Sequence, residues 1–173
     1  GQIYSNGNAY LLVEKGIGDS AASGLGMAFF CAGGILMGLF YGKLANALKD
    51  YTMGVGFVVM ALSYAIMALA PSIAVFYVGC LVLGLGMSVV MPGVFLNVGN
   101  SVGPAAVGMA LSIATCVQNF GQFCSPFLVN PVAEALGGAS GLVNVASFYV
   151  AAGVGALLGV IMIIRAAASG KKA

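Results

Sequence analysis

The sequence contains no histidine, and its 173 residues include only six Lys or Arg and four Asp or Glu. Histidine is the commonest metal ligand and the usual general base near neutral pH, so its absence excludes several classes of enzyme and metal site. A soluble domain has about a quarter of its residues charged. This chain has 6% charged and 61% hydrophobic residues. We therefore expect an integral membrane protein that is not an enzyme and needs no cofactor.

Five long runs of the sequence contain no Asp, Glu, Lys or Arg. They cover residues 21–41, 52–70, 73–97, 105–130 and 142–164. A membrane-spanning helix needs about 20 mainly apolar residues, and each run is long enough. A spanning barrel would need strands of alternating polarity, and no such alternation occurs. The sequence predicts an all-α polytopic membrane protein, a single transmembrane domain over residues 1–173 with five full transmembrane helices plus a partial one.

Lys and Arg are concentrated on one predicted side of the membrane. They follow the first and the fifth runs: Lys43, Lys49, Arg165, Lys171 and Lys172. The positive-inside rule makes that side cytoplasmic, so we expect a multi-pass protein of the plasma (inner) membrane with a cytoplasmic C-terminus. These scattered charges form no basic patch, and we expect no nucleic-acid partner.

The first residues resemble the end of another helix. Tyr10, Leu11, Leu12 and Val13 form a short apolar stretch, and Gly1 is not an initiator Met. We expect a chain that begins inside a sixth span and is therefore truncated at its N-terminus.

The run 105–130 carries a stripe of polar side chains spaced by three and four residues. The stripe consists of Ser112, Thr115, Gln118, Asn119, Gln122 and Ser125. This spacing places them on one helical face, which is unsuited to lipid. One interpretation is hydrogen bonding between helices, worth about 0.6 kcal/mol per contact. The other, which we favour, is a water-filled or substrate-lined cavity. The run 52–70, with only Ser63 and Tyr64 near its middle, is expected to be peripheral and to face lipid.

Glycine and proline mark positions of close packing and bending. Gly34, Gly38 and Gly42 recur every four residues and leave one helical face bare. Another helix can approach such a face, either as ordinary bundle packing or as a conformational contact. Pro92 and Pro126 interrupt the backbone hydrogen bonding of their runs, which favours bent helices.

Two segments resemble motifs of the major facilitator superfamily. Residues 38–49, Gly-Leu-Phe-Tyr-Gly-Lys-Leu-Ala-Asn-Ala-Leu-Lys, resemble the family's cytoplasmic loop signature, with departures at Asn46 and Leu48. Residues 121–126, Gly-Gln-Phe-Cys-Ser-Pro, resemble the Gly-x-x-x-Gly-Pro element of helix eleven, with Ser125 in place of the second Gly. The resemblance implies that residues 1–12 end helix seven and that the five runs are helices eight to twelve. The chain would then be the C-terminal six-helix half.

The resemblance also implies a function. Helices seven, eight, ten and eleven of the family line a central cavity, and two halves rock about it to give alternating access. We expect a secondary carrier of a small-molecule substrate, with efflux favoured over uptake, whose partners are the lipid bilayer and the missing N-terminal six-helix half. The alternatives are a non-transporting membrane scaffold or assembly subunit, and a channel.

Candidate site residues follow from the polar stripe, the flexible runs and the resemblance. The predicted substrate-binding residues are Thr115, Gln118, Asn119, Gln122, Ser88, Met91, Asn6 and Asn8. Further apolar candidates for the cavity are Met27, Phe30 and Met87. The predicted conformational or packing residues are Gly34, Gly38, Gly42, Lys43, Gly121, Ser125 and Pro126.

Overall fold

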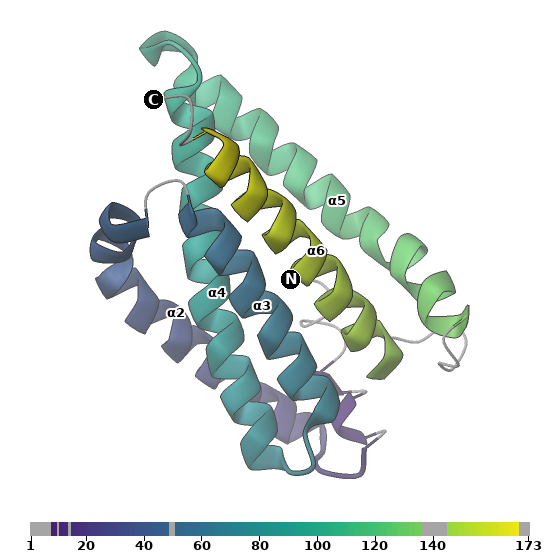
Figure 1. The fold of residues 1–173 in the computed structure, drawn as a ribbon. Helices are drawn as coiled ribbons and strands as arrows, with labels where there is room; N and C mark the ends of the chain where they lie inside the picture. Colours follow the sequence, from purple (N-terminus) through teal and green to yellow (C-terminus); the bar gives the residue numbers. More distant parts are fainter. Residues whose placement is uncertain (1–7, 10, 14, 49–50, 136–144, 170–173) are drawn as a thin grey trace.

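The computed structural model describes residues 8–9, 11–13, 15–48, 51–135 and 145–169. They form α2 (Ser20–Leu48), α3 (Thr52–Leu69), α4 (Ile73–Asn100), the 3-10 helix η2 (Pro104–Ala106), α5 (Val107–Ala135) and α6 (Val145–Ser169) (Figure 1). Residues 8–9 and 11–13 are also helical. No strand occurs in the described part of the chain, so the predicted all-α fold is confirmed.

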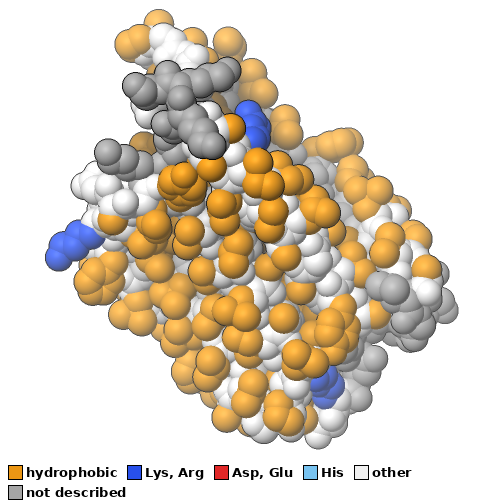
Figure 2. Space-filling model, in the orientation of Figure 1, with side chains coloured by type: hydrophobic (Ala, Val, Ile, Leu, Met, Phe, Trp, Pro, Cys, Tyr) orange, Lys and Arg blue, Asp and Glu red, His pale blue; other side chains and the backbone are white. Residues whose placement is uncertain are grey.

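Four helices among the described residues are long and apolar enough to cross a membrane. They are Ala21–Leu48, Thr52–Leu69, Ile73–Asn100 and Ala146–Ala168. Hydrophobic side chains are spread over the whole face shown in Figure 2, as expected for a surface in contact with lipid. The helix α5 has 29 residues but also carries the polar stripe, and it is not among these four. A fifth crossing therefore stays a prediction.

Helix α4 is the centre of the bundle. It packs extensively against α2 and α3, and α3 in turn packs against α6. The helix α5 makes far fewer contacts, with α4 and α6 (Figure 1). The order in space is therefore α2, α4, α3 and α6, with α5 held loosely beside α4 and α6.

The helix of residues 52–70, expected to be peripheral and to face lipid, is exposed on one face and buried on the other. One face of α3 is exposed, but Ser63 and Tyr64 are buried because α3 lies between α4 and α6. Glycines make this possible. A Cβ at Gly54 would lie 2.6 Å from the Ile163 side chain on α6, and one at Gly56 would lie 2.7 Å from Val90 on α4. Small residues let helix backbones approach closely, and this position was not visible from polarity alone.

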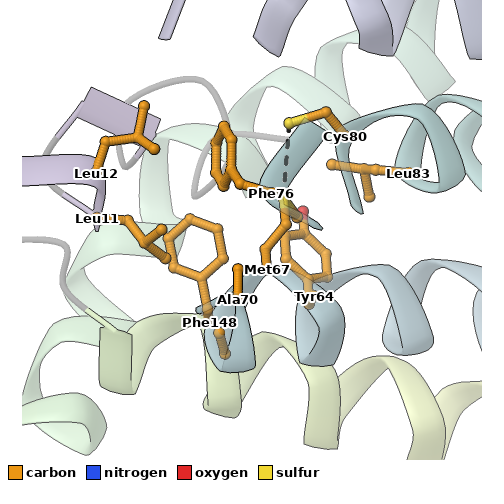
Figure 3. Close-up of a cluster of buried hydrophobic side chains, with 10 residues drawn as sticks. Leu11, Leu12, Tyr64, Met67, Ala70, Phe76, Cys80, Leu83 and Phe148 are labelled. Atoms are coloured by element: carbon orange, nitrogen blue, oxygen red, sulfur yellow. Dashed lines mark hydrogen bonds between the residues drawn. The ribbon is translucent and has the colours of Figure 1, made fainter. Parts of the chain in front are cut away.

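The densest core lies at the end of the bundle where α3 ends and α4 and α6 begin. Leu11 and Leu12, from the helical turn before α2, are 0% exposed there. They lie with Phe148 of α6, Phe76 of α4 and Met67 of α3 in one cluster of buried side chains (Figure 3). The first described residues thus anchor one end of the bundle. They are helical, as the apolar pattern of residues 10–13 predicts.

Lys15 caps the C-terminus of α3. Its Nζ donates hydrogen bonds to the carbonyl oxygens of Ala68 and Ala70, the latter at 3.0 Å. Carbonyls at a helix C-terminus lack helical donors and carry partial negative charge, so a cation stabilises them. We expect Lys15→Met, which keeps the apolar stem, to lower the free energy of unfolding by about 1–2 kcal/mol. Thermal unfolding of the purified protein measures this change.

The matched control is Lys43→Met, because Lys43 is exposed on α2. This control should leave the unfolding midpoint nearly unchanged. Equal midpoints for the two variants would contradict a stabilising role of the Lys15 cap.

Candidate functional site

Helices α2 and α4 touch backbone to backbone near their middles. A Cβ added to Gly84 would overlap the carbonyl oxygen of Phe30, and one added to Gly33 would overlap the carbonyl oxygen of Leu81. A Cβ at Gly34 would lie 3.2 Å from the Ser88 Oγ. These glycines therefore fix the crossing point of α2 and α4.

The backbones of the two helices separate further along the predicted glycine face of α2. A Cβ at Gly38 or at Gly42 would meet nothing within 4 Å. The space beside Gly38 is a cavity of about 360 Å³, lined by Gly38, Tyr41, Met87, Ser88, Met91 and Pro92. We call it the α2/α4 cavity. It begins beyond the point where the backbones of α2 and α4 touch.

Helix α5 reaches the wall of the α2/α4 cavity through one side chain. The Nε2 of Gln118 lies 3.5 Å from the Sδ of Met91 and donates a hydrogen bond to it. Three of the predicted substrate-binding residues, Ser88, Met91 and Gln118, are thus brought together from α4 and α5. They adjoin Gly38 of α2.

The lining of the α2/α4 cavity is uncharged and of mixed polarity. Tyr41 and Ser88 carry hydroxyls, and Met87 and Met91 carry thioethers. Pro92 has no N–H, so the carbonyl of Ser88 cannot receive its usual helical hydrogen bond from residue 92. The cavity therefore combines polarizable apolar walls with hydrogen-bonding groups.

The other predicted residues of α5 do not line this cavity. Thr115 is exposed, and its Oγ1 donates to the Leu111 carbonyl of its own helix at 2.9 Å. Asn119 is exposed and Gln122 is partly buried. A Cβ at Gly121 would meet nothing within 4 Å. The stripe is thus divided, because Gln118 contacts α4 while Thr115 and Asn119 are exposed.

Two buried polar atoms of the described residues have no hydrogen-bond partner. One is the Oγ of Ser125 on α5, and the other is the Oδ1 of Asn8, whose side chain is 2% exposed. Neither residue lines the α2/α4 cavity. Asn6 lies outside the described residues, and Pro126 lies within α5 with a side chain that the structure does not describe.

Among the remaining candidates, Lys43 is exposed near the end of α2, and Met27 is 41% exposed. Phe30 packs against the buried core cluster rather than a cavity. Sequence reasoning missed Tyr41. The sequence spacing could have identified it, because Tyr41 follows Gly38 by three residues and therefore lies on the same helical face.

A family model described as Major Facilitator Superfamily matches residues 3–173. The chain belongs to the major facilitator superfamily. It is therefore a multi-pass membrane protein of the transporter type, embedded in lipid and acting on a small molecule. No curated protein and no solved structure matches the chain significantly.

Proposed function

We propose that the chain is the C-terminal six-helix half of a secondary transporter, with α2 to α6 as helices eight to twelve. The observation that supports this proposal most directly is the hydrogen bond from Gln118 to Met91, a residue that lines the α2/α4 cavity. The contact joins α5 to α4, and the cavity itself lies between α4 and α2. These three helices would correspond to helices eight, ten and eleven. The resemblance implies that these helices line the family's substrate cavity. Neither α3 nor α6 contributes a lining residue.

The substrate class follows from the lining. A cavity with hydroxyls, thioethers and a carbonyl but no charged side chain suits an uncharged amphiphilic solute. A charged solute would lose its hydration without gaining an opposite charge. We propose that such a solute moves by alternating access and that the direction is efflux.

The proposal also includes the orientation of the chain in the membrane and the partner that it packs against. Lys43 and Arg165 lie at the same end of the bundle, since α2 and α6 both end there (Figure 1). The positive-inside rule makes this end cytoplasmic, in the plasma membrane. Apolar side chains of α5 such as Phe120, Phe123 and Phe127 are more than two-thirds exposed. We propose that the N-terminal six-helix half packs over α5.

The test is solute counterflow in proteoliposomes that contain the protein at its natural length. Uncharged amphiphilic solutes that raise its thermal unfolding midpoint are selected first, since ligands of the folded state raise that midpoint. A carrier exchanges such a solute with saturation and counterflow. A channel conducts it without counterflow, and a scaffold does neither. Either of the last two results would remove the transport proposal.

Gln118→Leu tests the site itself. Loss of the amide should lower the counterflow rate roughly tenfold, because a hydrogen-bonding group at the cavity wall is replaced by an apolar one. Ser112→Ala is the control, since its hydroxyl donates to the Gly108 carbonyl of its own helix at 2.9 Å. Asn119→Ala and Gln122→Ala extend the test to the rest of the stripe. Wild-type counterflow in Gln118→Leu, Asn119→Ala and Gln122→Ala alike would contradict the site assignment.

A further inference from the structure

A second, larger cavity lies at the end of the bundle where α2, α4 and α6 end and α3 begins. Its volume is about 730 Å³. The described residues that carry its polar groups are Tyr41, Thr52, Asn97, Asn100 and Arg165. We call it the α3/α6 cavity. It shares Tyr41 with the α2/α4 cavity, but the proposed transport function does not assign it a role.

Among the described residues that line the α3/α6 cavity, Arg165 is the charged one and none is acidic. A guanidinium presents a planar fork of donors that matches the oxygens of a phosphate group. The residue Arg165 is exposed, so an anion can reach it from the membrane surface.

The neighbouring polar groups also favour an oxygen-rich anion. The Nδ2 of Asn97 donates to the Sδ of Met53 at 3.0 Å. A thioether is a weak acceptor, so a phosphate oxygen would replace it favourably. Thr52 begins α3, and its N-cap residue Tyr51 makes no side-chain capping hydrogen bond. The first turn of a helix attracts negative charge, which adds to the field of Arg165.

The walls of the α3/α6 cavity are apolar. Met53, Val94 and Met162 line it together with Ala45 and Ala166. Polar groups and apolar walls thus meet at the ends of membrane-spanning helices, where headgroups and acyl chains meet. Basic pockets between transmembrane helices on the cytoplasmic side bind anionic lipid headgroups.

We propose that the α3/α6 cavity binds a phosphate-bearing anion through Arg165, Asn97 and Asn100, and that the source is the headgroup of an anionic phospholipid. Free phosphate offers the same phosphate oxygens as the headgroup, but it has no acyl chain to contact the apolar walls. The inference does not depend on transport, because it concerns a separate cavity and a separate ligand.

The experiment measures the thermal unfolding midpoint of the natural-length protein in a neutral detergent. Short-chain phosphatidylglycerol, short-chain phosphatidylcholine and inorganic phosphate are titrated separately. We expect phosphatidylglycerol to raise the midpoint saturably and phosphatidylcholine to have a much smaller effect. Arg165→Gln should weaken the apparent affinity for phosphatidylglycerol at least about tenfold, because a charge-assisted hydrogen bond is lost.

Lys43→Gln is the matched control, since it removes one positive charge from the same end without touching the cavity lining. It should keep the wild-type affinity. Asn100→Ala removes a polar group without changing the charge and should weaken binding less than Arg165→Gln. Should Arg165→Gln fail to fold, Arg165→Lys keeps the charge, loses the fork and is expected to bind more weakly than wild type.

Three outcomes decide the inference. Saturable binding of phosphatidylglycerol that Arg165→Gln weakens and Lys43→Gln does not supports it. Equal binding of inorganic phosphate at the same concentration supports the phosphate site and overturns the lipid as its source. An equal loss in Arg165→Gln and Lys43→Gln shows diffuse surface charge and overturns the site.

Discussion

Replacing Gly84 by Ala is expected to force α2 away from α4 and to lower the free energy of unfolding by about 1–3 kcal/mol. The added Cβ would overlap the carbonyl oxygen of Phe30 and lie 2.9 Å from the backbone nitrogen of Gly34. No rotamer change can relieve a contact between a Cβ and a backbone, so the helices themselves must move. Because α4 is the centre of the bundle, that displacement also affects its packing against α3.

The measurements are the thermal unfolding midpoint of the purified protein and the fraction of the protein that elutes as a single species in size-exclusion chromatography. Gly33→Ala is expected to behave like Gly84→Ala, since its Cβ would overlap the carbonyl oxygen of Leu81. Gly24→Ala, also on α2, is the control because a Cβ there meets nothing within 4 Å. If Gly84→Ala unfolded at the same temperature as Gly24→Ala, the close crossing of α2 and α4 would be wrong.

The helical fold was predictable because the charges of this chain lie between its spans. Charged side chains and unpaired backbone groups have a high free-energy cost in lipid. Uncharged runs of this length are therefore expected to form helices. The structure places helices over the described parts of the five runs, except at Ala70, which is the C-cap of α3. The packing order was not predictable in the same way. Polarity placed α3 at the periphery, whereas Gly54 and Gly56 bring it between α6 and α4.

The sequence predicted a set of candidate site residues on α5, but only some of them face a neighbouring helix. Spacing identified the polar stripe of α5 and placed Gln118 and Thr115 on one helical face, but it could not show which of them reaches α4. That depends on the angle at which α5 meets α4. Likewise, the repeat of Gly34, Gly38 and Gly42 predicted one continuous contact. The structure ends the close backbone contact after Gly34, because the backbones of a helix pair that crosses at an angle touch over a short length only.

This crossing links the fold to the proposed function. The close approach of α2 and α4 at Gly33 and Gly84 needs two bare backbones, and the backbones separate beyond it. The α2/α4 cavity opens one turn further on, beside Gly38, and α4 carries Pro92 at the same level. The glycines at the crossing thus stabilise the bundle, while the glycine beyond it leaves space. The two kinds of glycine should respond oppositely to substitution.

Gly38→Leu is therefore expected to leave the fold intact and to lower counterflow by about tenfold or more, since overfilling a site costs about 1–3 kcal/mol. A Cβ at Gly38 meets nothing within 4 Å, so the bundle tolerates a side chain there. The leucine would occupy part of the 360 Å³ of the α2/α4 cavity and displace a bound solute. Counterflow and the unfolding midpoint, measured on the same preparation, separate these two effects.

Gly42→Leu distinguishes blockage of the cavity from disturbance of a contact with the other half of the transporter. Gly42 is one helical turn further along α2, is equally open, and does not line the α2/α4 cavity. If the cavity holds the solute, Gly38→Leu loses transport and Gly42→Leu loses much less. If the glycine face instead packs against the other half, both variants lose transport to a similar degree. Gly24→Leu reports the effect of a leucine at another open position of α2, and a loss there as large as at Gly38 would contradict both explanations.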